Sequence, residues 1–172
     1  MGKARIPFNW AVVLTVIISL PFAMLLGKYS LDTWVSFMMW GVYFEYGAVP
    51  YNIKRIALAF PWGGLFASLW QTLALALSFK ISLFFAEIIG DIVFVSIIAY
   101  LAMVHKFTQE NMLASFQGLG LVLATFFTGF YPHFSNALLL QPWLALLWAT
   151  ISGIFGAILG FINKIIMFEK KD

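Results

Sequence analysis

The sequence alternates between long apolar segments and short polar breaks, and this alternation limits the fold more than any motif does. Each segment is close to the roughly 20 residues that carry an α-helix across a bilayer, and a spanning segment must satisfy its backbone hydrogen bonds internally. We therefore predict an all-α, polytopic transmembrane helix bundle with about six spans, a single domain over residues 1–172. The predicted spans are about 9–27, 33–51, 57–77, 81–104, 112–131 and 139–163.

Composition excludes the soluble classes. The chain is 63% hydrophobic and 10% charged, whereas a soluble domain carries about 25% charged residues. The absence of cysteine excludes disulfides, thiolate metal sites and cysteine nucleophiles. We expect no nucleic-acid partner, because the basic residues lie at segment ends, where they orient a membrane protein. The first segment is longer than the core of a signal peptide and lacks a small-residue cleavage site, so we expect it to be retained.

The basic residues also predict the orientation. With a cytoplasmic N-terminus, eight of the ten Lys and Arg residues fall on the cytoplasmic side and two fall outside. The eight are Lys3, Arg5, Lys54, Arg55, Lys106, Lys164, Lys170 and Lys171, and the two are Lys28 and Lys80. This partition favours an even number of spans with both termini inside, that is, N-in/C-in. The short breaks 28–32 and 78–80 predict that successive helices pack as antiparallel neighbours.

Identical residues at an offset of 56 suggest an internal hairpin duplication. The pairs are Phe60 with Phe116, Gly64 with Gly120 and Leu65 with Leu121. A genuine duplication would relate the second and third spans to the fourth and fifth, as in many transport proteins. Chance matches in apolar sequence are the alternative.

Three carboxylates fall inside predicted spans, where an ionisable group costs about 2.5–3.5 kcal/mol. Glu87 and Asp91 are four residues apart, so they share one helix face at roughly 6 Å. Two repelling carboxylates are typical of a proton relay or a cation site. The alternatives are that they cap or hydrogen-bond neighbouring helices, or that Glu87 is shallow enough to reach the outer interface. For Glu45 we favour a structural ion pair with Lys54 or Arg55.

Uncharged polar residues from several spans fall near the predicted midplane. They are Ser19, Gln71, Gln117, Thr125, Thr150 and Ser152. Such a layer can line a path for water or a small solute, although interhelical hydrogen bonds of about 0.6 kcal/mol are the simpler explanation for any Ser or Thr. We therefore assign Gln71 and Gln117, with Glu87, Asp91 and Glu45, to a predicted solute path or proton relay.

Two segments with helix-breaking residues lie near the cytoplasmic starts of spans three and five. They contain Phe60, Pro61, Trp62, Gly63 and Gly64, and Phe116, Gly118 and Gly120. Bent or unwound backbone at membrane depth can line a cavity, so we predict a gate or constriction here. The alternative for Pro61 is a proline in the first helical turn. In the last span, Gly153, Gly156 and Gly160 predict close helix packing.

Enzyme motifs are absent: there is no glycine-rich phosphate loop, no HExxH and no cysteine cluster. We predict no catalytic residue, metal site or cofactor. His105 and His133 fall at opposite membrane faces and cannot share a metal. Each is expected in a loop, with a pH-sensing role for His133 left open.

The stretches LDTWVSFMMWGVYF, AEIIGDIVFVSIIAYLAMV, LASFQGLG and ALLWATISGIFGAILGF occur in this order in a short chain. This pattern resembles a family of small six-span bacterial inner-membrane proteins, the domain of unknown function 1097. The resemblance runs from about residue 31 to 161 and implies a multi-pass protein of the bacterial plasma membrane, without naming an activity. It also implies that the acidic position at Glu87 recurs in the family, whereas Asp91 and Glu45 depart from the pattern.

The sequence favours a membrane channel or transporter (facilitator) for a small polar or cationic solute. Transport would be passive or proton-coupled, because no nucleotide site is present to drive pumping. Six short spans leave a thin wall around a pore, so we expect a homo-oligomer in the lipid bilayer. The alternative is a non-transporting assembly or accessory subunit that docks through the glycines of the last span. A lipid-modifying enzyme is least supported, because it lacks a nucleophile and base.

Overall fold

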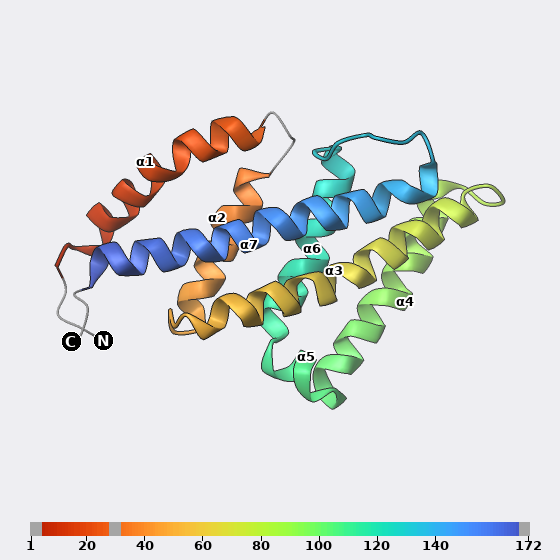
Figure 1. Ribbon diagram of the computed structural model, residues 1–172. Helices are drawn as coiled ribbons and strands as arrows, with labels where there is room; N and C mark the ends of the chain where they lie inside the picture. Colours follow the sequence, from red (N-terminus) through yellow and green to blue (C-terminus); the bar gives the residue numbers. More distant parts are fainter. Residues whose placement is uncertain (1–4, 28–31, 169–172) are drawn as a thin grey trace.

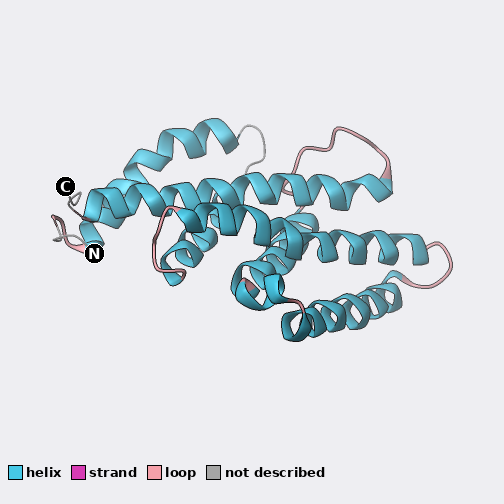
Figure 2. Cartoon of the chain, turned by 60° about the horizontal axis from the view of Figure 1, so that its bottom comes forward, coloured by secondary structure: helices cyan, strands magenta, loops and turns pink. Residues whose placement is uncertain are grey.

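The computed structural model of the chain describes residues 5–27 and 32–168. In these residues the chain is helical and contains no strand (Figure 2). The helices are α1 (Phe8–Gly27), α2 (Thr33–Glu45), α3 (Tyr51–Leu77), α4 (Leu83–Val104), α5 (Lys106–Glu110), α6 (Met112–Thr128), the 3-10 helix η1 (Leu138–Leu140) and α7 (Gln141–Met167). The all-α prediction is confirmed, and each predicted span coincides with one long helix. Of the charges used for orientation, Lys3, Lys28, Lys170 and Lys171 lie outside the described residues.

Three described stretches are long and apolar enough to cross a membrane: Phe8–Leu25, Leu83–Val104 and Leu138–Met167. The 17 residues of α6 and the 13 of α2 reach only about 25 Å and 20 Å, less than the hydrocarbon core of about 30 Å. The predicted end of the second span at residue 51 is wrong, since α2 stops at Glu45. Gly47 there takes a left-handed φ of 87°, which ends the helix.

The six long helices alternate in direction along the chain. In the contact of α2 with α7, Ser36 meets Gly156 and Tyr43 meets Gly160, so these two helices run parallel. Helices α3 and α6 are parallel in the same way, whereas α3 runs antiparallel to α4 and α7, and α1 runs antiparallel to α7. The most extensive packing is thus between parallel helices that are distant in the sequence.

The core is formed by α2, α3, α6 and α7. Helices α1 and α4 flank it on opposite sides, α1 against α7 and α4 against α3 (Figure 1). The predicted packing of successive helices as hairpins is therefore found for α3 and α4, but α1 and α2 make little direct contact.

The glycines of α7 explain why α2 packs on it. A Cβ on Gly156 would lie 2.0 Å from the backbone oxygen of Ser36, and one on Gly160 would lie 2.7 Å from the Tyr43 ring. Gly153 faces Met39 on the same helix. These three glycines let α2 approach closely, and the surface assigned to docking in the accessory-subunit hypothesis is already covered by α2.

Helices α3 and α6 cross where the gate was predicted. A Cβ on Gly63 would lie 1.7 Å from the Ser115 oxygen, and one on Gly118 would lie 1.9 Å from the Phe60 oxygen. Both helices are continuous here, so the expected unwinding is not found. Pro61 is the eleventh residue of α3, so the first-turn alternative is also wrong.

This crossing is reciprocal. Gly63 of α3 faces the backbone oxygen of Ser115 on α6, and Gly118 of α6 faces the backbone oxygen of Phe60 on α3. The reciprocal pairs differ by 55 positions, one less than the offset of the sequence repeat. Beyond this crossing the helices of the predicted duplication have different neighbours, since α2 packs along α7 and α4 packs along α3.

Candidate functional site

The first candidate site is the carboxylate of Glu87, which lies half-buried between α4 and α3. Its Oε2 accepts hydrogen bonds from Trp70 Nε1 at 2.9 Å and from Gln71 Nε2 at 3.0 Å. Gly90, one turn further along α4, makes room for the indole, because a Cβ there would lie 2.1 Å from Trp70 Cδ1. The apolar helix α4 is thus joined to α3 through an acidic side chain.

Two acceptor oxygens remain unused in this cluster. Gln71 is 1% exposed, and its Oε1 has no hydrogen-bond partner. Glu87 Oε1 forms no hydrogen bond to the described residues either, because both donors bind Oε2. A buried acceptor without a donor costs about 1–3 kcal/mol. The two oxygens suit a small group rich in N–H donors, such as ammonium, guanidinium or an amide.

The other predicted path residues lie apart from this cluster. Asp91 is exposed and forms no hydrogen bond or ion pair with the described residues, so the two acids of α4 have different surroundings. Gln117 is half-buried on α6, and Glu45 is exposed at the end of α2. Of the five path residues, only Gln71 and Glu87 come together.

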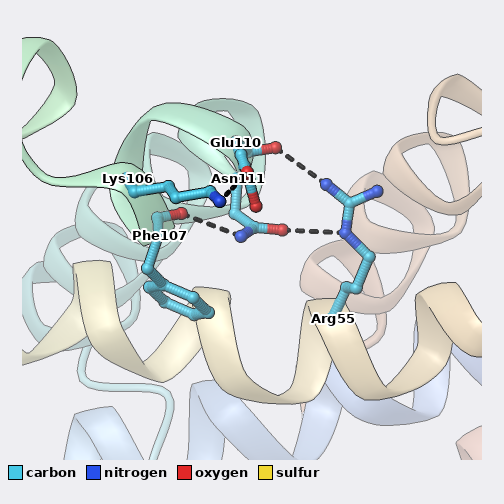
Figure 3. A network of polar contacts seen from close by, with 5 residues as sticks. All are labelled: Arg55, Lys106, Phe107, Glu110 and Asn111. Carbon is cyan, nitrogen blue, oxygen red and sulfur yellow. Dashed lines mark hydrogen bonds and ion pairs between the residues drawn. The ribbon is translucent and has the colours of Figure 1, made fainter.

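The predicted ion pair of Glu45 with Lys54 or Arg55 is wrong, since the described residues form one salt bridge, between Lys106 and Glu110 at 3.9 Å. Arg55 instead joins α3 to the α5–α6 junction (Figure 3). Its Nε donates to Asn111 Oδ1 at 3.0 Å and its Nη2 to the Glu110 backbone oxygen at 2.8 Å.

Asn111 completes this junction by donating from Nδ2 to the Phe107 oxygen at 2.8 Å. The Arg55 guanidinium also lies 4.8 Å from the centre of the Tyr46 ring. Arg55 therefore has several structural partners. They lie at the end of the molecule that the distribution of basic residues predicts to face the cytoplasm.

Each of the two histidines contacts a polar side chain that is close to it in the sequence. His105, between α4 and α5, contacts Thr108 Oγ1 at 3.1 Å and stacks on Trp62, and the indole of Trp62 donates to the same hydroxyl at 3.0 Å. His133 contacts Gln141 Oε1 at 3.1 Å. The described residues contain no cluster of His, Asp or Glu suited to a metal.

A second candidate site surrounds Asp32, which sequence reasoning missed. Asp32 is 1% exposed. Its Oδ2 accepts a hydrogen bond from Thr125 Oγ1 of α6 at 2.8 Å, and its backbone N–H donates to Ser152 Oγ of α7 at 3.0 Å. Ser36 Oγ of α2 donates to the backbone oxygen of Ser152 at 2.8 Å. Asp32 Oδ1 is buried and has no hydrogen-bond partner.

Asp32 was missed because an aspartate directly before an apolar helix normally caps that helix in a loop. Here its side chain makes no cap hydrogen bond to α2 and is bonded to α6 instead. One signal was available: Thr125 and Ser152 were both predicted near the midplane, and both bind Asp32.

A cavity of about 260 Å³ lies beside this site, between α1, α2 and α7. Its wall is mainly apolar but includes Ser36 and Ser152, the partners of Asp32. A second cavity of about 120 Å³ also touches Ser36 and is bounded by Ser19 of α1. Two residues that bond the backbone of Asp32 therefore line open space.

An all-helical chain with apolar helices of this length is a membrane protein by class. The sequence profile described as "Protein of unknown function (DUF1097)" matches residues 11–167, and the chain belongs to this family. The match runs from within α1 to the end of α7 and confirms the resemblance stated from the sequence. No curated protein and no solved structure matches the chain.

Proposed function

We propose that this protein is a multi-pass channel or facilitator of the bacterial inner membrane for a small cationic or polar solute. The observation that carries the proposal is the pair of free acceptor oxygens on Glu87 and Gln71. A solute with several N–H donors could bind both oxygens while passing between α3 and α4. Glu87 lies only four residues, about 6 Å, from the start of α4, so this site would select solutes near the outer entrance.

Helix direction supports six crossings with both termini inside. Successive long helices alternate, and the backbone N–H of Arg5 donates to the Met167 oxygen at 2.9 Å, so the two ends of the described chain meet on one side. Helices α2 and α6 are shorter than the hydrocarbon core, so the two proposed crossings that contain them need a locally thinned bilayer or a contribution from the flanking residues.

The tight crossing of Gly63 with Gly118 is the proposed constriction. Backbone meets backbone there, so opening a path along α3 requires α6 to slide or tilt. A shift of one helix past another is an established way to switch between packed states.

A homo-oligomer is part of the proposal because of Asp91. This carboxylate is exposed on an apolar helix about 12 Å from its start, where contact with lipid costs about 2.5–3.5 kcal/mol at the bilayer centre. A second copy packed along α4 would cover it and could place Asp91 beside a shared path.

The proposal is tested by flux into liposomes that contain the purified protein. Methylammonium, guanidinium, urea, short amides and short carboxylates are compared, each with and without a pH gradient. We expect uptake of a cation or amide above that of empty liposomes and little uptake of carboxylates. Absence of uptake for every class would reject transport. It would favour the non-transporting accessory subunit, for which the exposed apolar faces of α1 and α4 offer docking surfaces.

A further inference from the structure

Asp32 packs beside the middle of the apolar stretch Leu138–Met167. Its backbone bonds to Ser152, which is 14 residues from the beginning and 15 from the end of the apolar stretch Leu138–Met167. The carboxyl group at this position is buried and is packed against α6 and α7, away from both ends of this stretch.

The described surroundings of Asp32 contain no compensating charge. Helices α1 and α6 have no charged residue. The one charged residue of α2, Glu45, lies about 20 Å along that helix, and the one of α7, Lys164, lies about 18 Å from Ser152. Lys28 is outside the described residues. A buried ion without a partner is strongly disfavoured, and neutralisation is the usual outcome.

The hydrogen bonds of the carboxyl group also favour its neutral form. Thr125 donates to Oδ2, and the indole of Trp34 approaches the same carboxyl, but Oδ1 is left without a partner. The N-terminus of α2 favours an anion at this position. That effect is partial, because the side chain makes no hydrogen bond to the first-turn N–H groups of α2.

We propose that Asp32 is a proton-binding site inside the membrane, with the proton carried on Oδ1. Hydronium that enters the adjacent cavity transfers one proton, an O–H bond forms on Oδ1, and water remains. Ser36 and Ser152 line this cavity and their hydroxyls bond the backbone of Asp32, so the cavity reaches the residues that hold Asp32 in place. This site is separate from Glu87 and does not depend on the proposed solute.

The test is infrared spectroscopy of the protein in lipid, titrated with pH in a sodium-free buffer. We expect the C=O stretching band of a protonated carboxylic acid at neutral pH. Asp32→Asn should remove the band, and the matched control Asp91→Asn should retain it. A wild-type spectrum without the band at neutral pH, or a band that persists in Asp32→Asn, would overturn the proposal.

A second variant keeps the test informative if Asp32→Asn does not fold. Thr125→Val removes the donor to Oδ2 and should move the band to a higher frequency; an unmoved band would contradict the assignment to Asp32. Repeating the titration in sodium separates a proton from a metal cation, since loss of the band in sodium would replace the proposed proton site with a cation site. None of these measurements uses a transported solute, so failure of the flux assay leaves them interpretable.

Discussion

Thr125 donates a hydrogen bond to Asp32 at 2.8 Å although the two residues are 93 positions apart. The bond links the residue before α2 to the C-terminal part of α6, and both residues are buried. Bonds of this kind have few replacements when they are lost, because no solvent takes over the role of the missing donor.

We expect Thr125→Val to lower the thermal stability of the purified protein. The substitution keeps the shape of the side chain but removes the hydrogen bond that Thr125 donates to a buried carboxyl, at a cost of about 1–3 kcal/mol. The loss of monodisperse protein on heating is the measurement. Thr128→Val is the control, because Thr128 is exposed and bonds only to its own helix. Equal behaviour of the two variants would contradict a stabilising role for the Asp32 contact.

Gly118→Ala is expected to destabilise the fold, since the added methyl would lie 1.9 Å from the backbone oxygen of Phe60 and must push α3 and α6 apart. Overpacking of this kind typically costs about 1–3 kcal/mol. Gly120→Ala is a matched control two residues away, where a Cβ meets nothing within 4 Å. Alanine at that position should be neutral or stabilising by up to about 1 kcal/mol. If both variants unfold at the same temperature, the close crossing is not a feature of the protein in solution.

Arg55→Lys should weaken the junction of α3 with α5 and α6. A lysine cannot bond both Asn111 and the Glu110 oxygen with the geometry of a guanidinium, so we expect a loss of about 1.5–3 kcal/mol. Limited proteolysis at the α4–α5 connection measures the loosening. The control is Lys54→Arg, a change at the exposed residue before Arg55. This variant should be digested at the wild-type rate. Unchanged digestion of Arg55→Lys would show that the contacts in Figure 3 do not hold this junction.

Glu87→Gln is expected to reduce cation flux at least tenfold while retaining the fold. The glutamine oxygen can still accept from Trp70 and Gln71, but the negative charge that attracts a cation is gone. Flux of a neutral amide should fall less. The control in the same liposome assay is Glu110→Gln. This change removes an exposed carboxylate and keeps the Glu110 backbone oxygen that binds Arg55. Equal cation flux in the two variants would remove Glu87 from the path.

The sequence predicted the number and positions of the long helices because apolar length is a local property. It did not predict their neighbours. Short breaks implied hairpins, yet α2 packs on α7 and makes little contact with α1, and Gly156 and Gly160 allow the close approach of α2 to α7. That preference depends on surfaces 116 or more residues apart and has no local signature.

The candidate sites likewise include residues that the sequence predicted and residues that it did not. Glu87 was identified because an acid inside an apolar segment is anomalous, and its partner Gln71 followed from the polar layer. Asp32 stood at a segment end, where an acid is ordinary, and only the depth at which α2 meets α7 makes it exceptional. Lys54 or Arg55 was expected to pair with Glu45 because they are close in sequence. Arg55 instead bonds two acceptors, the Asn111 side chain and the Glu110 backbone oxygen.

The parallel pairing of α2 with α7 also sets an order for biogenesis. In the proposed six-span arrangement α2 is made and inserted while its partner is still untranslated, so Asp32 and Ser36 would enter the bilayer before Ser152 exists to bind them. Until α7 arrives, these polar groups depend on water, on lipid headgroups or on an insertion factor. A ribosome-stalled chain that ends after α6 should therefore be the form most readily captured by the insertion machinery and by membrane proteases.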